Sequence, residues 1–112
     1  MKSNTEFIKT LIAEVPDLQS LYDNHLKENN ELLPHVFFGD LTRYVVEKIQ
    51  SRKREDESFV KRILSILEEG LNQGSQEVEE LIDVSFVENL SDQEEILVRL
   101  KEFGGPKLLQ KI

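Results

Sequence analysis

Apolar residues recur every three or four positions along almost the whole 112-residue chain. The clearest case is the stretch ELLPHVFFGDLTRYVVEKIQ (residues 31–50), in which one such series is Phe38, Leu41, Val45 and Ile49. This spacing places side chains on one face of an α-helix. Further apolar residues widen the face, namely Phe37, Tyr44 and Val46. We therefore expect a central helix with neighbours on two sides.

Five other segments have the same period, at about residues 3–15, 16–26, 55–71, 76–86 and 91–103. Several begin with residues that favour helix starts. Ser3 with Glu6, and Ser91 with Glu94, have the spacing of a capping box. Pro34 suits a first helical turn, where its missing N–H would have no partner. The pattern thus predicts about six helices joined by short connections.

Strands are not indicated, because no segment of useful length alternates apolar and polar residues. VSFVENL is the best candidate, but the preceding ELIDV favours a continuing helix. GGP at residues 104–106 ends the sixth segment, and the following KLLQKI has room for one last turn. We predict a single all-α domain over residues 1–112, a compact array of about six antiparallel amphipathic helices. A short stack of helical hairpins is the alternative, although no fixed repeat supports it.

The composition excludes several classes of protein. There is no cysteine, so disulfides and thiolate metal sites are excluded, which fits a reducing compartment. No run approaches the roughly 18 apolar residues of a membrane span. Charges interrupt the N-terminal MKSNTEFIKTLIAEVP, unlike the apolar core of a signal peptide. We expect a soluble, cytoplasmic protein without membrane contact.

The net charge of −8 is unevenly distributed, because residues 68–102 hold eleven acidic and two basic residues. Such a segment repels nucleic acid and favours a basic partner. The best basic stretch is SRKR with Lys61 and Arg62, but Glu55, Asp56 and Glu57 are interleaved there. We therefore predict a protein partner and no binding to nucleic acid.

The predicted central helix carries a polar cluster of His35, Asp40, Arg43 and Glu47. The last three are spaced i, i+3 and i+7, so Arg43 can pair with either carboxylate. They form either a solvated strip worth less than about 1 kcal/mol or an arginine anchor for a partner's carboxylate. A metal site that includes His35 is disfavoured, since His35 and Asp40 face different sides of a helix.

Two further residues need an explanation. Gly39 inside a helix costs about 1 kcal/mol relative to alanine. We expect it to allow close approach of a neighbouring helix; the alternative is a break at which Asp40 caps a new segment. His25 lies on an apolar stripe, and we expect a partly buried, hydrogen-bonded core residue rather than a base.

Catalytic motifs are missing from the sequence. It has no cysteine nucleophile, no GxSxG and no Walker glycine-rich loop. Neighbouring glutamates, such as Glu68 with Glu69 and Glu79 with Glu80, point in different directions on a helix and are poor acid/base pairs. We therefore predict no catalytic residue, no metal and no cofactor, and a protein that is not an enzyme.

The segments ELLPHVFFGDLTRYV and EELIDVSFVENL resemble a family of small, acidic, all-helical bacterial proteins, mostly uncharacterised, with LLPHxFFGDxxR-like and SFxEN-like segments. The match covers roughly residues 31–50 and 79–90. The resemblance implies the role of an immunity protein encoded beside a polymorphic or contact-dependent toxin. It transfers no reaction to any of His35, Asp40, Arg43, Ser85 and Glu88.

The leading hypothesis is a non-catalytic immunity protein that neutralises a cognate toxin through an acidic surface and is a monomer or weak dimer when free. The contact residues expected on the fifth and sixth helices are Glu77, Glu79, Glu80, Asp83, Glu94 and Glu95. The alternative is a helical scaffold or regulatory module that self-associates through spare apolar surface of the central helix or through KLLQKI. A third possibility, ranked below both, is a small-molecule pocket near His35 and Tyr44.

Overall fold

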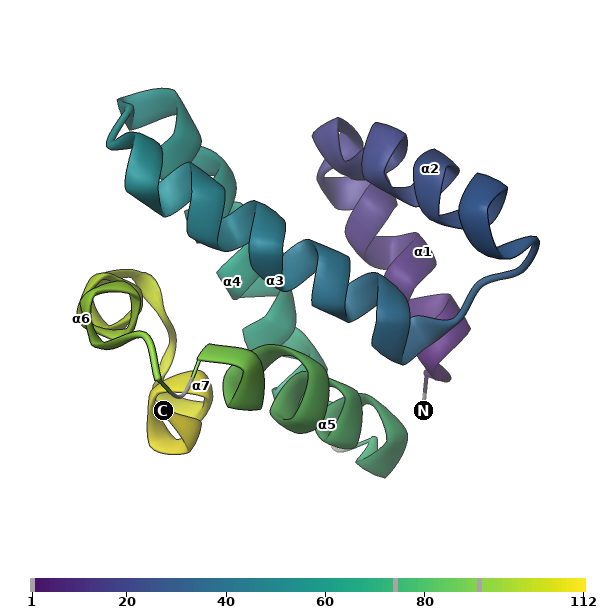
Figure 1. Cartoon of the computed structure of the whole chain (residues 1–112). Coiled ribbons are helices and arrows are strands. Elements are labelled where there is room, and N and C mark those ends of the chain that lie inside the picture. Colours follow the sequence, from purple (N-terminus) through teal and green to yellow (C-terminus); the bar gives the residue numbers. More distant parts are fainter. Residues whose placement is uncertain (1, 74, 91) are drawn as a thin grey trace.

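A long helix, α3 (Pro34–Ser51), lies at the centre of the computed structural model, which describes residues 2–73, 75–90 and 92–112 (Figure 1). The surrounding helices are α1 (Asn4–Glu14), α2 (Gln19–Asn29), α4 (Arg54–Asn72), α5 (Gln76–Ile82), α6 (Glu94–Phe103) and α7 (Pro106–Lys111). The side chains of Phe37, Phe38 and Leu41 are completely buried, and α3 contacts all of the first five neighbours. The predicted central helix is confirmed.

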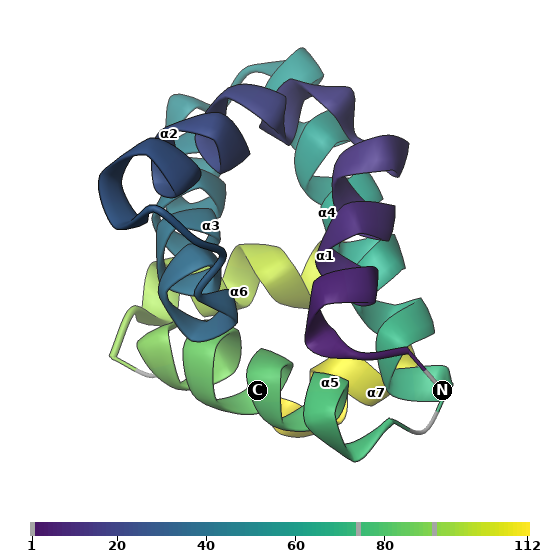
Figure 2. The ribbon, with the colours of Figure 1, turned by 90° about the vertical axis from the view of Figure 1, so that its right-hand side faces the viewer.

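The all-α prediction is confirmed, and the described residues form no strand. They contain seven α-helices rather than about six, because KLLQKI belongs to a helix of its own, α7. Helix α6 is seen end-on in Figure 1, where α3 runs across the view, and lengthwise in Figure 2. The array is therefore not a plain up-and-down bundle. Within the described ranges, no helix is long and apolar enough to cross a bilayer.

The helix starts follow the sequence signals where these can be compared. Ser3 and Glu6 form the predicted capping box, each accepting a backbone N–H of the other at 3.2 Å. The N–H of Ser3 lowers the pKa of the Glu6 carboxyl. Pro34 occupies the first turn of α3 as predicted. The capping box at Ser91 and Glu94 lies outside the described residues in part, and α6 begins without a side-chain cap from Gln93.

Two glycines lie inside helices, and their surroundings differ. A Cβ at Gly70 would lie 2.7 Å from Cε1 of Phe7, so glycine lets α4 approach α1; the two helices run side by side in Figure 2. Among the described residues, a Cβ at Gly39 would meet only Arg43 Nη1, at 3.8 Å. The expected close approach at Gly39 is therefore wrong. The alternative break is wrong as well, because α3 continues unbroken through Asp40.

The short α7 is attached to α4 by a carboxylate from far away in the sequence. Glu68 accepts the backbone N–H groups of Lys107 and Leu108, at 3.0 and 2.9 Å. These amides begin a helix, so a negative charge is favourable there. A Cβ at Gly105 would lie 2.6 Å from this carboxylate group, and Leu108 is completely buried. The GGP sequence therefore ends α6 and also admits the cap of α7.

Helix α5 continues through a π-helical turn (Asp83–Val87) and a 3₁₀ turn (Glu88–Leu90). The stretch VSFVENL is therefore helical, as the sequence favoured, but its register is irregular. The backbone carbonyl of Ser85 accepts hydrogen bonds from Thr42 Oγ1 at 2.9 Å and from Asn89 Nδ2 at 2.8 Å. The bond from Thr42 ties the irregular turn to α3, and the bond from Asn89 is local to the turn.

Substitution of Gly70 tests the packing of α1 on α4. Gly70→Ala forces a methyl group against the buried ring of Phe7, so we expect a loss of about 1–3 kcal/mol in unfolding free energy. Urea unfolding followed by circular dichroism measures it. A variant as stable as the wild type would contradict the close contact.

Candidate functional site

The outer side of α3 carries a polar ridge of Asp40, Arg43 and Glu47, the strip that the sequence predicted. Of its two possible partners, Arg43 pairs with Asp40. The Arg43 side chain is 73% exposed, so water screens the pair and its contribution to stability is below about 1 kcal/mol. The charges of the ridge therefore point to solvent and do little for the fold.

His25 of α2 lies beside this ridge and is almost completely buried. Its Nε2 accepts the backbone N–H of Leu33 at 3.0 Å, and its ring packs edge-on against Phe37 with centroids 5.6 Å apart. The expected hydrogen-bonded core histidine is thus confirmed, and it is buried more deeply than predicted. The other ring nitrogen, Nδ1, lies 3.3 Å from Asn29 Nδ2 and 3.8 Å from Asp40 Oδ2. His25 joins α2 to the start of α3.

His35 has a different environment from the rest of the predicted cluster. Its Nδ1 shares a hydrogen bond of 2.6 Å with Ser85 Oγ on the π-helical turn. This bond connects the two segments on which the family resemblance rests. The predicted cluster is therefore divided, with Asp40, Arg43 and Glu47 on the ridge and His35 at Ser85. In the described ranges no three metal-ligating side chains of His, Cys, Asp or Glu come close enough to hold an ion.

Two grooves flank the ridge. The first, the α2–α3 groove, has a volume of about 280 Å³ and is lined by Leu21, Asn24, His25, Glu28, Asp40, Arg43, Tyr44 and Glu47. Leu21 and Tyr44 are half-buried and supply an apolar base, while Glu28 and Glu47 are exposed. Burial raises the pKa of the Tyr44 hydroxyl, so it stays protonated at neutral pH. Three carboxylates and one guanidinium thus surround a partly apolar hollow.

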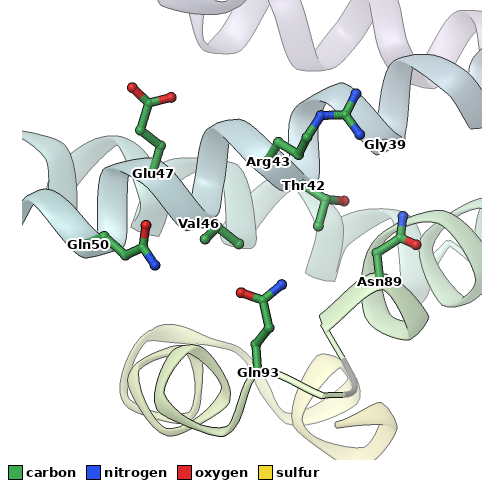
Figure 3. A pocket seen from close by; sticks show the side chains of 8 residues that line it. All are labelled: Gly39, Thr42, Arg43, Val46, Glu47, Gln50, Asn89 and Gln93. Atoms are coloured by element: carbon green, nitrogen blue, oxygen red, sulfur yellow. The ribbon is translucent and has the colours of Figure 1, made fainter.

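The second, the α3–α6 groove, lies between α3 and the segment that leads into α6 (Figure 3). Its volume is about 330 Å³, and its lining consists of Gly39, Thr42, Arg43, Val46, Glu47, Gln50, Asn89 and Gln93. In Figure 3, Thr42, Val46 and Gln50 point from α3 toward Asn89 and Gln93, while Arg43 and Glu47 project from the upper edge of α3 at the rim of the groove. Three primary amides therefore converge here, and Arg43 and Glu47 line both grooves.

Three of the acidic residues expected to meet a partner bind groups of the same chain. Glu77 accepts the backbone N–H of Asn4 at 3.2 Å. Lys111 Nζ lies 3.4 Å from Glu79 and 3.0 Å from Asp83. These carboxylates hold the two ends of the chain on α5.

The remaining three lie on α5 and at the start of α6. Glu95 pairs with Arg52 at 3.2 Å, and both side chains are about three-quarters exposed. Glu80 and Glu94 are exposed and make no ion pair with any described residue. Of the six predicted contact residues, the carboxylates of these two make neither a hydrogen bond nor an ion pair with the side chain or backbone of another described residue, and Glu77 binds only a neutral amide.

Sequence reasoning found the ridge but missed most of the residues that line the grooves. Glu28 stands three positions after His25 on α2, a spacing that places both on one helix face. That signal was available. No comparable signal marks Gln50, Asn89 and Gln93, because their proximity depends on how α3 packs against a distant segment. His35 and Tyr44, expected to share a pocket, line no common groove among those described.

Comparison with known families places the chain. It belongs to DUF7674, a family defined by a domain of unknown function, whose model matches residues 8–112. No curated protein and no solved structure matches the chain. The DUF7674 match reaches from α1 to the end of α7, so both grooves and the Ser85 turn lie inside the family domain.

Two substitutions separate structural from surface roles near the ridge. His25→Ala removes a ring from the core and leaves the Leu33 amide without its acceptor, so we expect a loss of roughly 2–4 kcal/mol in unfolding free energy. Arg43→Ala should cost less than about 1 kcal/mol. Urea unfolding of both variants tests this ranking, and equal losses would refute it.

Lys111 gives the fold a pH-dependent attachment. Its hydrogen bond to Asp83 raises the pKa of the ammonium group, with Glu79 adding to the effect. The resulting stability is complete below the ordinary lysine pKa of about 10.4 and is lost as the pH rises through the raised value. Lys111→Met should melt below the wild type at neutral pH, and the difference should vanish in strongly alkaline solution. A difference that persists there would indicate that Lys111 stabilises by packing alone.

Proposed function

We propose that this protein is a non-catalytic binding protein, and specifically an immunity protein that neutralises a basic toxin domain by stoichiometric contact. The observation that supports this most directly is the make-up of the α2–α3 groove. Glu28, Asp40 and Glu47 surround it, and Arg43 is the one basic residue in its lining. We propose this groove as a contact for basic side chains of the partner.

The groove suits a lysine or arginine side chain in both of its parts. Such side chains have an apolar stem and a cationic head. Leu21 and Tyr44 offer apolar surface for the stem. Because Arg43 is already paired with Asp40, the charges of Glu28 and Glu47 remain for the head. A partner's cation would therefore meet surplus negative charge here.

The buried polar groups beside the groove support binding more than catalysis. His25 accepts the Leu33 amide, and Thr42 donates to the carbonyl of Ser85. Both side chains are thus engaged in holding α3 in place. A general acid or base must be able to exchange a proton with a substrate. Docking requires a shaped and charged surface, which the ridge and its grooves supply.

The overall charge of the protein also favours a basic partner. The net charge is −8, and the exposed Glu80 and Glu94 add to the negative surface on α5 and α6. Toxin domains that attack nucleic acids carry basic surfaces, and complementary potentials speed association and disfavour wrong partners. This extends the acidic surface expected from the sequence to a second face, that of α2 and α3.

The alternative of a self-associating scaffold has less support. The apolar face of α3 is buried in the core, and α7 packs against its own α4. Among the described residues, the large apolar side chains that are exposed are Val36, Val84 and Val98, one on each of three segments. Single exposed apolar residues are normal on a monomer.

The product of the gene next to this one in its genome provides the test. Its C-terminal domain is expressed in a bacterial host with and without the present protein, and growth is measured. We expect the domain to be toxic alone and harmless in the presence of this protein. The association rate of the purified pair should fall steeply as salt rises. A harmless neighbour, or a rate independent of salt, would contradict the proposal.

Three double variants with the same change of charge locate the contact. Glu28→Lys with Glu47→Lys reverses the α2–α3 groove, and we expect it to abolish protection. Glu80→Lys with Glu94→Lys tests the face predicted from the sequence. The matched control reverses two exposed glutamates on other helices, Glu14 and Glu69. If the control variant lost protection as completely as the groove variant, net charge rather than the groove would be responsible.

A further inference from the structure

Gly39 is a glycine that the fold itself does not explain. It lies in the interior of an 18-residue helix, where glycine is less favourable than alanine. Its backbone does not have the positive φ that favours glycine. A Cβ added to it would make only an ordinary contact, with Arg43 Nη1 at 3.8 Å. Alanine would therefore fit here and stabilise the isolated protein.

At two other positions, a close contact within the chain explains why the residue is glycine. At Gly70 a Cβ would lie 2.7 Å from the Phe7 ring, and at Gly105 it would lie 2.6 Å from the Glu68 side chain. Both admit a close neighbour from the same chain. Gly39 instead faces the α3–α6 groove, which is open to solvent. Among the described residues none occupies the place of the missing Cβ, so a neighbour from outside the chain has room to reach this backbone.

We propose that the α3–α6 groove is a docking site for an extended main-chain segment of a protein partner, which passes closely over Gly39. The side chains that line the groove match the chemistry of a peptide backbone. Primary amides offer both a donor and an acceptor, as each peptide group does. Gln50 and Gln93 converge on the groove with Asn89 (Figure 3).

The hydrogen bonds within the fold indicate which groups remain for the partner. The single hydroxyl proton of Thr42 is already shared between the carbonyls of Phe38 and Ser85, which lie 2.7 and 2.9 Å from Oγ1. Asn89 Nδ2 donates to the Ser85 carbonyl, which leaves Asn89 Oδ1 to accept a peptide N–H. The bare backbone at Gly39 then lets that peptide lie close to α3.

Charge separates this groove from its neighbour across the ridge. Arg43 and Glu47 are the charged residues in the lining of the α3–α6 groove, one of each sign. A neutral segment therefore suits it better than a basic side chain, which suits the α2–α3 groove. The inference rests on the proposed function only in that the occupant belongs to a protein partner. One partner can occupy both grooves by crossing the ridge.

The test uses a phage-displayed library of random linear peptides, panned on the folded wild-type protein. We expect enriched peptides to shift the NMR signals of the Gly39 backbone amide and of the Gln50, Asn89 and Gln93 side-chain amides. Gly39→Ala should raise the melting temperature by about 3–5 °C. It should also weaken binding of these peptides about tenfold, because the methyl group blocks close approach.

A serine on another helix provides the control. Ser65 is exposed on α4, and Ser65→Ala also improves helix propensity. It should raise the melting temperature slightly and leave peptide affinity unchanged. Gly39→Leu should remove binding while the protein remains folded by circular dichroism. A variant that is more stable and yet binds less well is the result that a purely structural glycine would not give.

Several results would overturn the inference. They are the enrichment of no peptide, equal affinity of the wild type and Gly39→Ala, and NMR shifts confined to the α2–α3 groove. The same experiments distinguish failure of this inference from failure of the proposed function. If peptides are lost with Glu28→Lys and Glu47→Lys but tolerate Gly39→Ala, the acidic groove is the binding site and the α3–α6 groove is not. If they depend on Gly39 alone while the neighbouring gene product is harmless, the groove stands and the immunity role fails.

Discussion

Thr42 Oγ1 donates a hydrogen bond to the carbonyl of Ser85, and this buried bond sets where α3 stands relative to the second half of the chain. That carbonyl lies on the π-helical turn and accepts from two side chains, Thr42 and Asn89. His35 adds a second link to the same residue. Buried groups therefore hold α3 and this turn together beside the α3–α6 groove, whose lining ranges from the buried Thr42 to the exposed Gln50 and Asn89. The fold thus positions the exposed side chains of this site, although those side chains add little to the stability of the protein.

The helices could be predicted because their signals are local. Periodicity along α3 and the capping box at Ser3 each involve residues on one turn or one face. The π-helical turn was not predictable in the same way, because an α-helix and a π-helix of five residues share the same apolar pattern. The cap of α7 was hidden for another reason. Glu68 lies about forty positions before the amides that it binds, and nothing in GGPKLL specifies the partner.

The residues of the candidate site also differ in whether local spacing or long-range packing brings them together. Asp40, Arg43 and Glu47 were found because they lie on one helix, where spacing alone implies contact. Asn89 and Gln93 reach the same surface from another part of the chain, so only the packing of α3 reveals them. The number of acidic residues in a segment also did not reveal which carboxylates are paired within the chain. The acidic third of the sequence looks uniformly exposed, yet the rest of the chain supplies partners to its carboxylates, from the Asn4 amide to the Lys111 ammonium, as well as the Arg52 guanidinium.

The misjudged glycine carries the most information about function. Helical glycine indicates that something approaches the backbone closely, but the sequence does not say whether that neighbour belongs to the same chain. At Gly70 the neighbour is Phe7, and their close contact packs α4 against α1. At Gly39 the space is open, so the isolated protein bears the cost of glycine without a contact in return. Stability given up at a partly exposed position beside a groove is typical of a surface shaped for binding. The ridge beside it, with charges that add little to stability, fits the same description.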